Sequence, residues 1–254
     1  MRNDFTCSLN GEEMHLLDPR IYIEDIEETV KNTAETGKRP HYGQTLVGPV
    51  GHDNIAVAVY FMIKEPNRFR RQQIITKING WAQAGWLTVS TRPWQRIYVV
   101  CTQPVSTEAF KWSADMKLVF TAYDEAYWQT TLPVTVTGSG TSASLAINPL
   151  GTHRCGLEAE IKNISGSAVN TLSLAVNDKT IAFEELGLAN NKTLVIGYDE
   201  RHYLFAKVDG VSKLNCRTGA SADDLWLNPG VANSVQCTCQ RDCSIKLIAR
   251  GAYD

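Results

Sequence analysis

Residues 55–63 read Ile-Ala-Val-Ala-Val-Tyr-Phe-Met-Ile, an unbroken apolar run that is rich in β-branched side chains. The run is shorter than a typical helix, so it predicts a strand that is buried on both faces. Two later runs, at residues 97–101 and 116–122, predict further strands, and the second alternates apolar and polar side chains. These three stretches indicate that the first half of the chain is built on one β-sheet system.

A helix is predicted over residues 67–83, between the first two of these strands. Asn67 is a residue type that caps helix N-termini, and Gly80 weakens the last turn by about 1 kcal/mol relative to alanine. Apolar side chains recur at helical spacing, at Ile74, Ile75, Ile78 and Trp81. We interpret this apolar stripe as the face that covers the sheet.

Two segments before residue 55 are predicted to lie at the surface. Residues 24–28, Glu-Asp-Ile-Glu-Glu, indicate a solvated sheet edge or a charged patch between subunits. Between Lys31 and Asn54 the chain is rich in Gly, Pro and Thr and shows no clear periodicity. A structureless stretch of this length is uncommon in a compact domain and is typical of a functional arm or loop.

The second half of the chain has shorter, more frequent strands separated by turns, a pattern typical of a β-sandwich or jelly roll. A domain boundary is expected within the segment Thr130–Thr141. We therefore predict a mainly β protein with two domains, residues 1–132 and residues 133–254. The strands predicted in the second domain lie at residues 145–147, 157–161, 171–176, 180–183, 193–196 and 202–208.

Composition and charge exclude several classes of protein. The chain has 254 residues, of which 43% are hydrophobic, and its formal net charge is -2. A near-neutral balance argues against nucleic-acid binding, which needs an excess of Lys and Arg. The first residues lack the apolar core of a signal peptide, and no apolar run is long enough to span a membrane. We expect a soluble product of the cytoplasm whose seven cysteines are reduced thiols.

The sequence contains no motif of an established catalytic site. Nucleophile-elbow, Walker, dinucleotide-binding and zinc-protease patterns are all missing. No histidine stands at metal-ligand spacing from another; the five are His15, His41, His52, His153 and His202. We assign no catalytic, cofactor-binding or metal-binding residue, and predict that the protein is not an enzyme. A glycosidase remains an alternative, because its acid pair cannot be recognised from spacing along the chain.

Two groups of residues are candidate ligand sites. Cys237, Cys239 and Cys243 would offer thiolates to a soft metal if a turn at residues 240–242 brought the third back toward the others. A structural zinc site needs a fourth ligand, and free cysteine is also a common core residue. Aromatic side chains suggest a sugar-stacking platform or, alternatively, core and interface anchors: Trp81, Trp86, Trp94, Trp112, Trp128 and Trp226.

A set of segments that spans nearly the whole chain has a familiar order: residues 5–11 and 17–21, residues 57–100, residues 118–128, residues 148–152, and residues 225–233. In this order the chain resembles the distal tail (Dit) proteins of long-tailed, non-contractile bacteriophages. Departures from the family pattern are Ala126, where a proline is expected, and the two residues between Gly230 and Asn233.

This resemblance implies a structural role at the virion tail tip. Its expected consequences are an N-terminal β-sandwich with a helix that closes a hexameric ring, and a peripheral C-terminal galectin-like β-sandwich. The implied partners are the tail tube protein above the ring, a tail-tip or tail-associated lysin protein below it, and the tape measure protein; neither nucleic acid nor membrane is a partner. The main alternative function is a carbohydrate-binding module for bacterial surface glycans.

Overall fold

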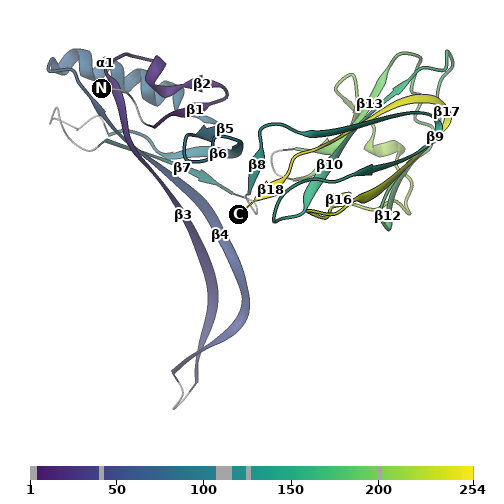
Figure 1. Cartoon of the computed structure of the whole chain (residues 1–254), viewed down its shortest axis with the longest axis horizontal. Coiled ribbons are helices and arrows are strands. Elements are labelled where there is room, and N and C mark those ends of the chain that lie inside the picture. The colour runs from purple at the N-terminus through teal and green to yellow at the C-terminus, as the bar shows by residue number, and fades with distance from the viewer. Residues whose placement is uncertain (1–4, 40–42, 107–115, 124–126, 200–201, 254) are drawn as a thin grey trace. The chain divides into compact units, whose positions relative to one another are not determined.

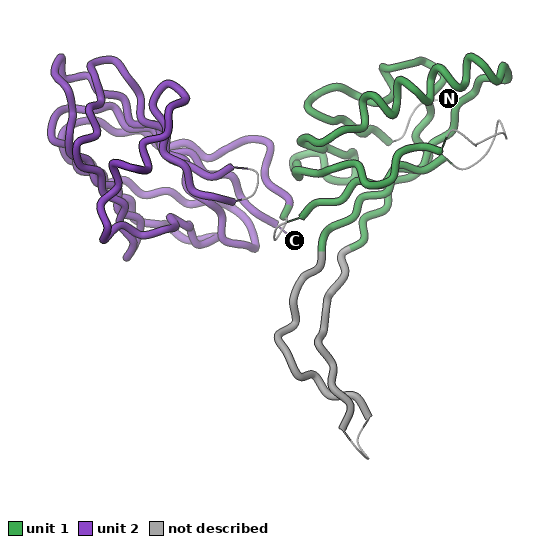
Figure 2. The backbone as a smooth tube through the Cα atoms, turned by 180° about the vertical axis from the view of Figure 1, so that it is seen from behind, with its two compact units in different colours: residues 1–127 green, residues 128–254 purple. Residues whose placement is uncertain are grey.

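The computed structural model describes residues 5–39, 43–106, 116–123, 127–199 and 202–253, and for residues 30–53 it describes the backbone alone. The chain divides into two compact units, residues 1–127 (unit 1) and residues 128–254 (unit 2), coloured separately in Figure 2. Strands dominate both units, and the α-helix of the described residues, α1 (Arg68–Trp81), lies in unit 1 (Figure 1). The predicted fold class, a mainly β chain with one covering helix, is confirmed.

The strands of unit 1 form an antiparallel sheet whose neighbours follow the order β2-β1-β5-β6-β7-β4-β3. A short 3-10 helix, η1 (Met14–Leu16), follows β2. The strand bounds are β1 (Cys7–Leu9), β2 (Glu12–Glu13), β3 (Ile21–Arg39), β4 (Gly43–Ile63), β5 (Ala84–Val89), β6 (Gln95–Gln103) and β7 (Met116–Ala122).

Strand β4 contains the apolar run that was predicted to be buried on both faces. Its Val57, Val59 and Phe61 are fully buried, but Tyr60 and Met62 on the opposite face are half-exposed. The prediction of two buried faces is therefore wrong for this strand. The physical reason is that antiparallel sheets commonly pack one face on the core and leave the other near solvent.

Helix α1 covers the sheet of unit 1, as predicted. It starts at Arg68 after the cap residue Asn67 and ends at Trp81, close to the expected range of 67–83. The Trp81 ring packs edge-to-face on Phe120 of β7, with ring centroids 6.1 Å apart, and its Nε1 donates to the carbonyl of Glu12 at 3.1 Å. The apolar stripe of the helix is buried: Ile74, Ile75, Ile78 and Trp81.

The segment Lys31–Asn54 was expected to lack regular structure, but its described residues, 31–39 and 43–54, belong to strands β3 and β4. These strands pair antiparallel from Ile21 opposite Ile63 to Arg39 opposite Gly43, with three register shifts along the way. The expectation of a structureless stretch is wrong for the paired residues. The register shifts break the regular alternation of side chains between the two faces, so the sequence shows no clear strand periodicity. The expectation that the segment is a functional arm stays a prediction.

Unit 2 contains a second antiparallel sheet system whose neighbours follow the order β12-β11-β17-β10-β13-β14-β15. Strand β9 pairs with β17, and β16 pairs with the start of β10. Outside this sheet, the first strand of the unit, β8, pairs with the last, β18. The bounds are β8 (Trp128–Thr130), β9 (Val134–Ile147), β10 (Cys155–Asn163), β11 (Leu172–Val176), β12 (Lys179–Phe183), β13 (Thr193–Tyr198), β14 (Leu204–Val208), β15 (Val211–Ser212), η2 (Leu214–Cys216), β16 (Trp226–Leu227), β17 (Asn233–Ala249) and β18 (Ala252–Tyr253).

Strand β17 changes neighbours at its middle. Its first part pairs with β11, from Val235 to Cys239, and its second part pairs with β10, from Cys243 to Ala249. Strand β9 pairs with β17 on the other side, and a bulge in β17 between Thr238 and Cys243 separates the two parts. Much of the segment Thr130–Thr141, within which a domain boundary is expected, belongs to strand β9. The sequence did not indicate this strand, because a Thr-, Ser- and Gly-rich edge strand carries little apolar signal.

Candidate functional site

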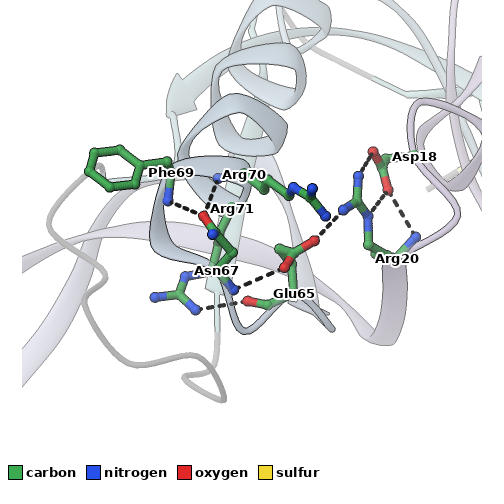
Figure 3. Close-up of polar contacts among 7 residues, drawn as sticks. All are labelled: Asp18, Arg20, Glu65, Asn67, Phe69, Arg70 and Arg71. Atoms are coloured by element: carbon green, nitrogen blue, oxygen red, sulfur yellow. Dashed lines mark hydrogen bonds and ion pairs between the residues drawn. The ribbon is translucent and has the colours of Figure 1, made fainter.

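A cluster of charged side chains joins the start of β3 to the start of α1 (Figure 3). Arg20 binds Asp18 through two hydrogen bonds, from Nε to Oδ1 at 2.7 Å and from Nη2 to Oδ2 at 2.8 Å, and also pairs with Glu65. Asp18 and Glu65 are both buried, each residue being 5% exposed. Because bidentate arginine–carboxylate pairs are geometrically specific, the cluster fixes the helix start against the sheet.

The same cluster sets the protonation of its carboxylates. The hydrogen bond from Arg20 lowers the pKa of Asp18, against the opposing effect of burial. The pKa of Glu65 is lowered first by the backbone N–H of Asn67, which donates to Oε1 at 2.9 Å, and then by Arg20. Both groups are therefore held as carboxylates. Sequence reasoning missed this cluster, because Arg20 and Glu65 are 45 residues apart along the chain.

The first turn and the middle of α1 carry exposed basic and aromatic side chains. Asn67 Oδ1 accepts from the backbone N–H groups of Phe69 and Arg70, at 3.0 and 3.1 Å, which orients this turn. The side chain of Phe69 is 80% exposed, and Arg68, Arg70 and Lys77 lie at exposed positions of the same helix. We call these four residues the α1 surface.

The terminal strand of the unit 1 sheet, β3, presents an exposed surface of opposite charge. Glu24, Asp25 and Glu27 are exposed, and we call them the β3 edge. Glu27 accepts a hydrogen bond from the Tyr60 hydroxyl at 2.9 Å, and the neighbouring Glu28 pairs with Arg92 at 2.8 Å. The acidic run that the sequence singled out therefore lies on a sheet edge, as predicted.

The three cysteines near the end of the chain come together at the bulge of β17. Cys237, Cys239 and Cys243 are all buried, and the Cys237 and Cys239 sulfurs are 3.7 Å apart. Hydrogen bonding with Cys237 and burial raise the pKa of Cys239 to about 12, and hydrogen bonding with Cys239 raises that of Cys243. Among the described residues, no group of His, Cys, Asp or Glu is arranged to hold a metal.

The tryptophans do not form one surface. Trp81 and Trp128 are buried, whereas Trp94 is 74% exposed. The Trp226 ring stacks on Tyr198 with centroids 4.8 Å apart and lies under the Arg154 guanidinium, so protein groups occupy its aromatic surface. By unit, Trp81, Trp86 and Trp94 lie in unit 1, Trp128 and Trp226 lie in unit 2, and Trp112 lies outside the described residues.

The described histidines are also dispersed. His15 lies in η1 beside Glu13, with Nδ1 and Oε2 3.2 Å apart, while His153 and His202 belong to unit 2. The side chains of His41 and His52 lie outside the described residues. The helices within the described ranges are too short or too polar to cross a membrane.

Comparison with known proteins identifies the fold. No protein-family model matches the chain, and no curated protein sequence matches it. Solved structures that share the fold are hub and baseplate proteins of phage tails. One is the Dit protein of phage SPP1, described as a paradigm of the hub adsorption apparatus in phages that infect Gram-positive bacteria, with 13% identity and a TM-score of 0.65. The match covers 97% of this chain and 98% of that protein.

Two further matches come from the baseplate of phage P2 in its activated conformation. The chain in the calcium-bound structure is 7% identical, with a TM-score of 0.56, and the match covers 99% of this chain and 98% of that chain. The strontium-bound structure gives 7% identity, a TM-score of 0.56 and 97% coverage of both chains. These comparisons confirm, at the level of the fold, the resemblance to distal tail proteins that the sequence shows.

Proposed function

We propose that this chain is a structural protein of a phage tail tip, where it forms a hexameric ring and acts by assembly rather than by catalysis. The observation that carries the proposal is the fold match with the SPP1 Dit protein, which extends over 97% of this chain and includes both units. In this role the ring joins the tail tube protein to a tail-tip or lysin protein, with the tape measure protein as a further partner.

A closed ring needs two different surfaces on each copy, because a cyclic contact is heterologous. Unit 1 has two such candidates, the basic α1 surface with its exposed Phe69 and the acidic β3 edge. Opposite charges steer association and fix its register, and a buried aromatic anchor supplies much of the binding energy. The proposed ring contact therefore places the α1 surface of one copy against the β3 edge of the next.

The first experiment measures the mass of the purified chain by light scattering on a sizing column over a concentration series. The ring predicts about six times the 28.2 kDa chain mass. The double variant Phe69→Ala, Arg70→Glu is expected to give smaller particles, and Lys162→Glu, at an exposed position of β10, is the matched control. A double variant that assembles like the wild type would contradict the α1 contact.

The second experiment tests the proposed arm within the β3–β4 pair. Asn32 and His52 lie opposite each other in the register, so residues 33–51 can be replaced by a two-residue Asn-Gly hairpin turn. We expect this variant to be folded, with the circular dichroism signature of a strand-rich protein, and to form no ring-sized particle. Assembly at the wild-type mass would show that the arm does not contribute to the ring.

A further inference from the structure

Strand β9 forms an open edge of unit 2. It runs from Val134 to Ile147 and pairs with β17 along one side (Figure 1). Within the described ranges, no strand pairs with its other side, and no backbone hydrogen bond to a turn or loop takes that place. An edge of this length exposes a row of backbone N–H and C=O groups to which another chain can add a strand.

The composition of β9 differs from that of the other edges of the same chain. It reads Val-Thr-Val-Thr-Gly-Ser-Gly-Thr-Ser-Ala-Ser-Leu-Ala-Ile and contains neither a charged residue nor proline. Charges, proline and short length are the usual features that keep sheet edges from pairing. The other edges have them: β2 is two glutamates, β3 contains residues 24–28, β12 begins with Lys179, and β15 has two residues.

The inward side of β9 is incompletely covered. Val134 and Val136 face the interior but remain half-exposed, whereas the residues opposite them on β17, Ala249 and Leu247, are buried. The valines are more exposed than the residues opposite them because, among the described strands, β9 pairs with β17 alone. A further strand beside β9 would bury these two valines, which adds hydrophobic stabilisation to the backbone hydrogen bonds.

We propose that β9 pairs with β9 of a second copy of this chain, antiparallel around a two-fold axis. A neutral strand can pair with its own copy without bringing like charges together, which a charged edge cannot do. Residues 134–140 pair with β17 without a register shift. A two-fold contact that uses this whole segment is centred on Thr137, and it places Thr135 opposite Ser139 and Val136 opposite Gly138.

The contact is independent of the ring proposed above, because it lies in unit 2 and relates two copies by a two-fold axis. The test is sedimentation velocity of the full chain over a concentration series. We expect Thr137→Lys to weaken the two-fold association at least about tenfold, because two lysines would face each other at the axis. The particle mass then falls to half of the wild-type value at the same concentration.

Thr180→Lys is the matched control, since Thr180 is also an exposed strand residue on an edge of unit 2. It is expected to keep the wild-type mass. A wild-type chain that shows no doubling of mass with concentration would overturn the proposal, as would a Thr137→Lys variant that associates like the wild type. Shortening residues 33–51 separates the two proposals, because it is expected to dissolve the ring and leave pairs of chains.

A cross-linking experiment tests the register. In antiparallel pairs the Cα atoms of opposite residues are about 4.5–5.5 Å apart, within the range that a disulfide spans. Thr137→Cys is therefore expected to form a disulfide-linked dimer under oxidised glutathione, whereas Ser144→Cys, exposed in the other part of β9, is expected to give none. Equal cross-linking of both variants, or of neither, would overturn the two-fold pairing.

Discussion

At the scale of single residues, two side chains fix the start of α1. Asn67 caps the helix through two backbone N–H groups, and Arg20 joins the carboxylates of Asp18 and Glu65 beneath it. The cap was predicted from the sequence, because capping depends on residues that are adjacent along the chain. The charged cluster was not predicted, because it depends on strand β4 returning to β3 before α1 begins.

Replacing the cap should destabilise unit 1. We expect Asn67→Ala to lower the free energy of unfolding by about 1 kcal/mol, because two backbone N–H groups lose their acceptor. Urea unfolding followed by circular dichroism measures the change. The control is Thr76→Ala, at an exposed mid-helix position, which is expected to be neutral or slightly stabilising. Equal destabilisation by both substitutions would contradict the role of the cap.

The charged cluster predicts an acid-dependent loss of stability. The pKa values of Asp18 and Glu65 are lowered in the folded protein, so their contribution is present above the ordinary carboxyl pKa values and is lost as pH falls through the lowered ones. We expect Arg20→Met to reduce the stability of unit 1 near neutral pH. The difference from the wild type should shrink in acid, as measured by urea unfolding at a series of pH values.

The matched control for this series is Arg241→Met, at an exposed position of unit 2 outside the cluster. It is expected to leave the unfolding of unit 1 unchanged at every pH. A stability difference for Arg20→Met that stays constant from neutral to acidic pH would show that the arginine acts through packing alone.

At the scale of elements, the bulge in β17 determines the environment of the clustered cysteines. The sequence predicted that Cys237 and Cys239 share a face of one strand, and both are buried. At residues 240–242, where a turn would bring Cys243 back toward the other two, β17 instead has a bulge and then continues with β10 as its neighbour. A local sequence cannot distinguish these outcomes, because the choice depends on which distant strands are available for pairing.

Thiol labelling tests this environment. Cys101 and Cys216 are half-exposed, and the other five cysteines are buried. Burial raises the pKa of Cys7 and Cys155 to about 12, so their reactive thiolate forms are scarce at neutral pH. We expect iodoacetamide to label Cys101 and Cys216 in the folded protein and all seven after unfolding in guanidinium, as read by mass spectrometry. Labelling of Cys239 or Cys243 in the folded protein would contradict their burial at the bulge of β17.

At the scale of the whole molecule, we propose that the two compact units are domains. A fragment of residues 128–254 retains β8 and its pairing with β18, whereas a fragment of residues 133–254, the expected second domain, lacks β8. We therefore expect both fragments to contain strands and the longer one to unfold at higher temperature. Calorimetry of the two fragments measures this, and equal melting temperatures would place the boundary after β8.

The class of fold could be predicted from the sequence, whereas the pairing of strands that are distant along the chain could not. Buried runs such as residues 116–122 and the helical stripe around Ile78 are local signals, and they predicted the class of fold. The sequences of β9 and β3 predict strands only weakly. Both are edge strands rich in Thr, Ser or charged residues, and side chains that do not pack in a core show no clear apolar alternation. The α1 surface and the β3 edge are described by the structure, whereas their contact stays a prediction.

The pairing of β8 with β18 also affects how unit 2 can be exchanged. Because these strands are the first and last of the unit, the chain enters and leaves it at the same place. Units whose ends lie side by side tolerate circular permutation and transfer into other proteins. An exchange of unit 2 as a single segment would therefore need two junctions that lie close together, one before β8 and one after β18.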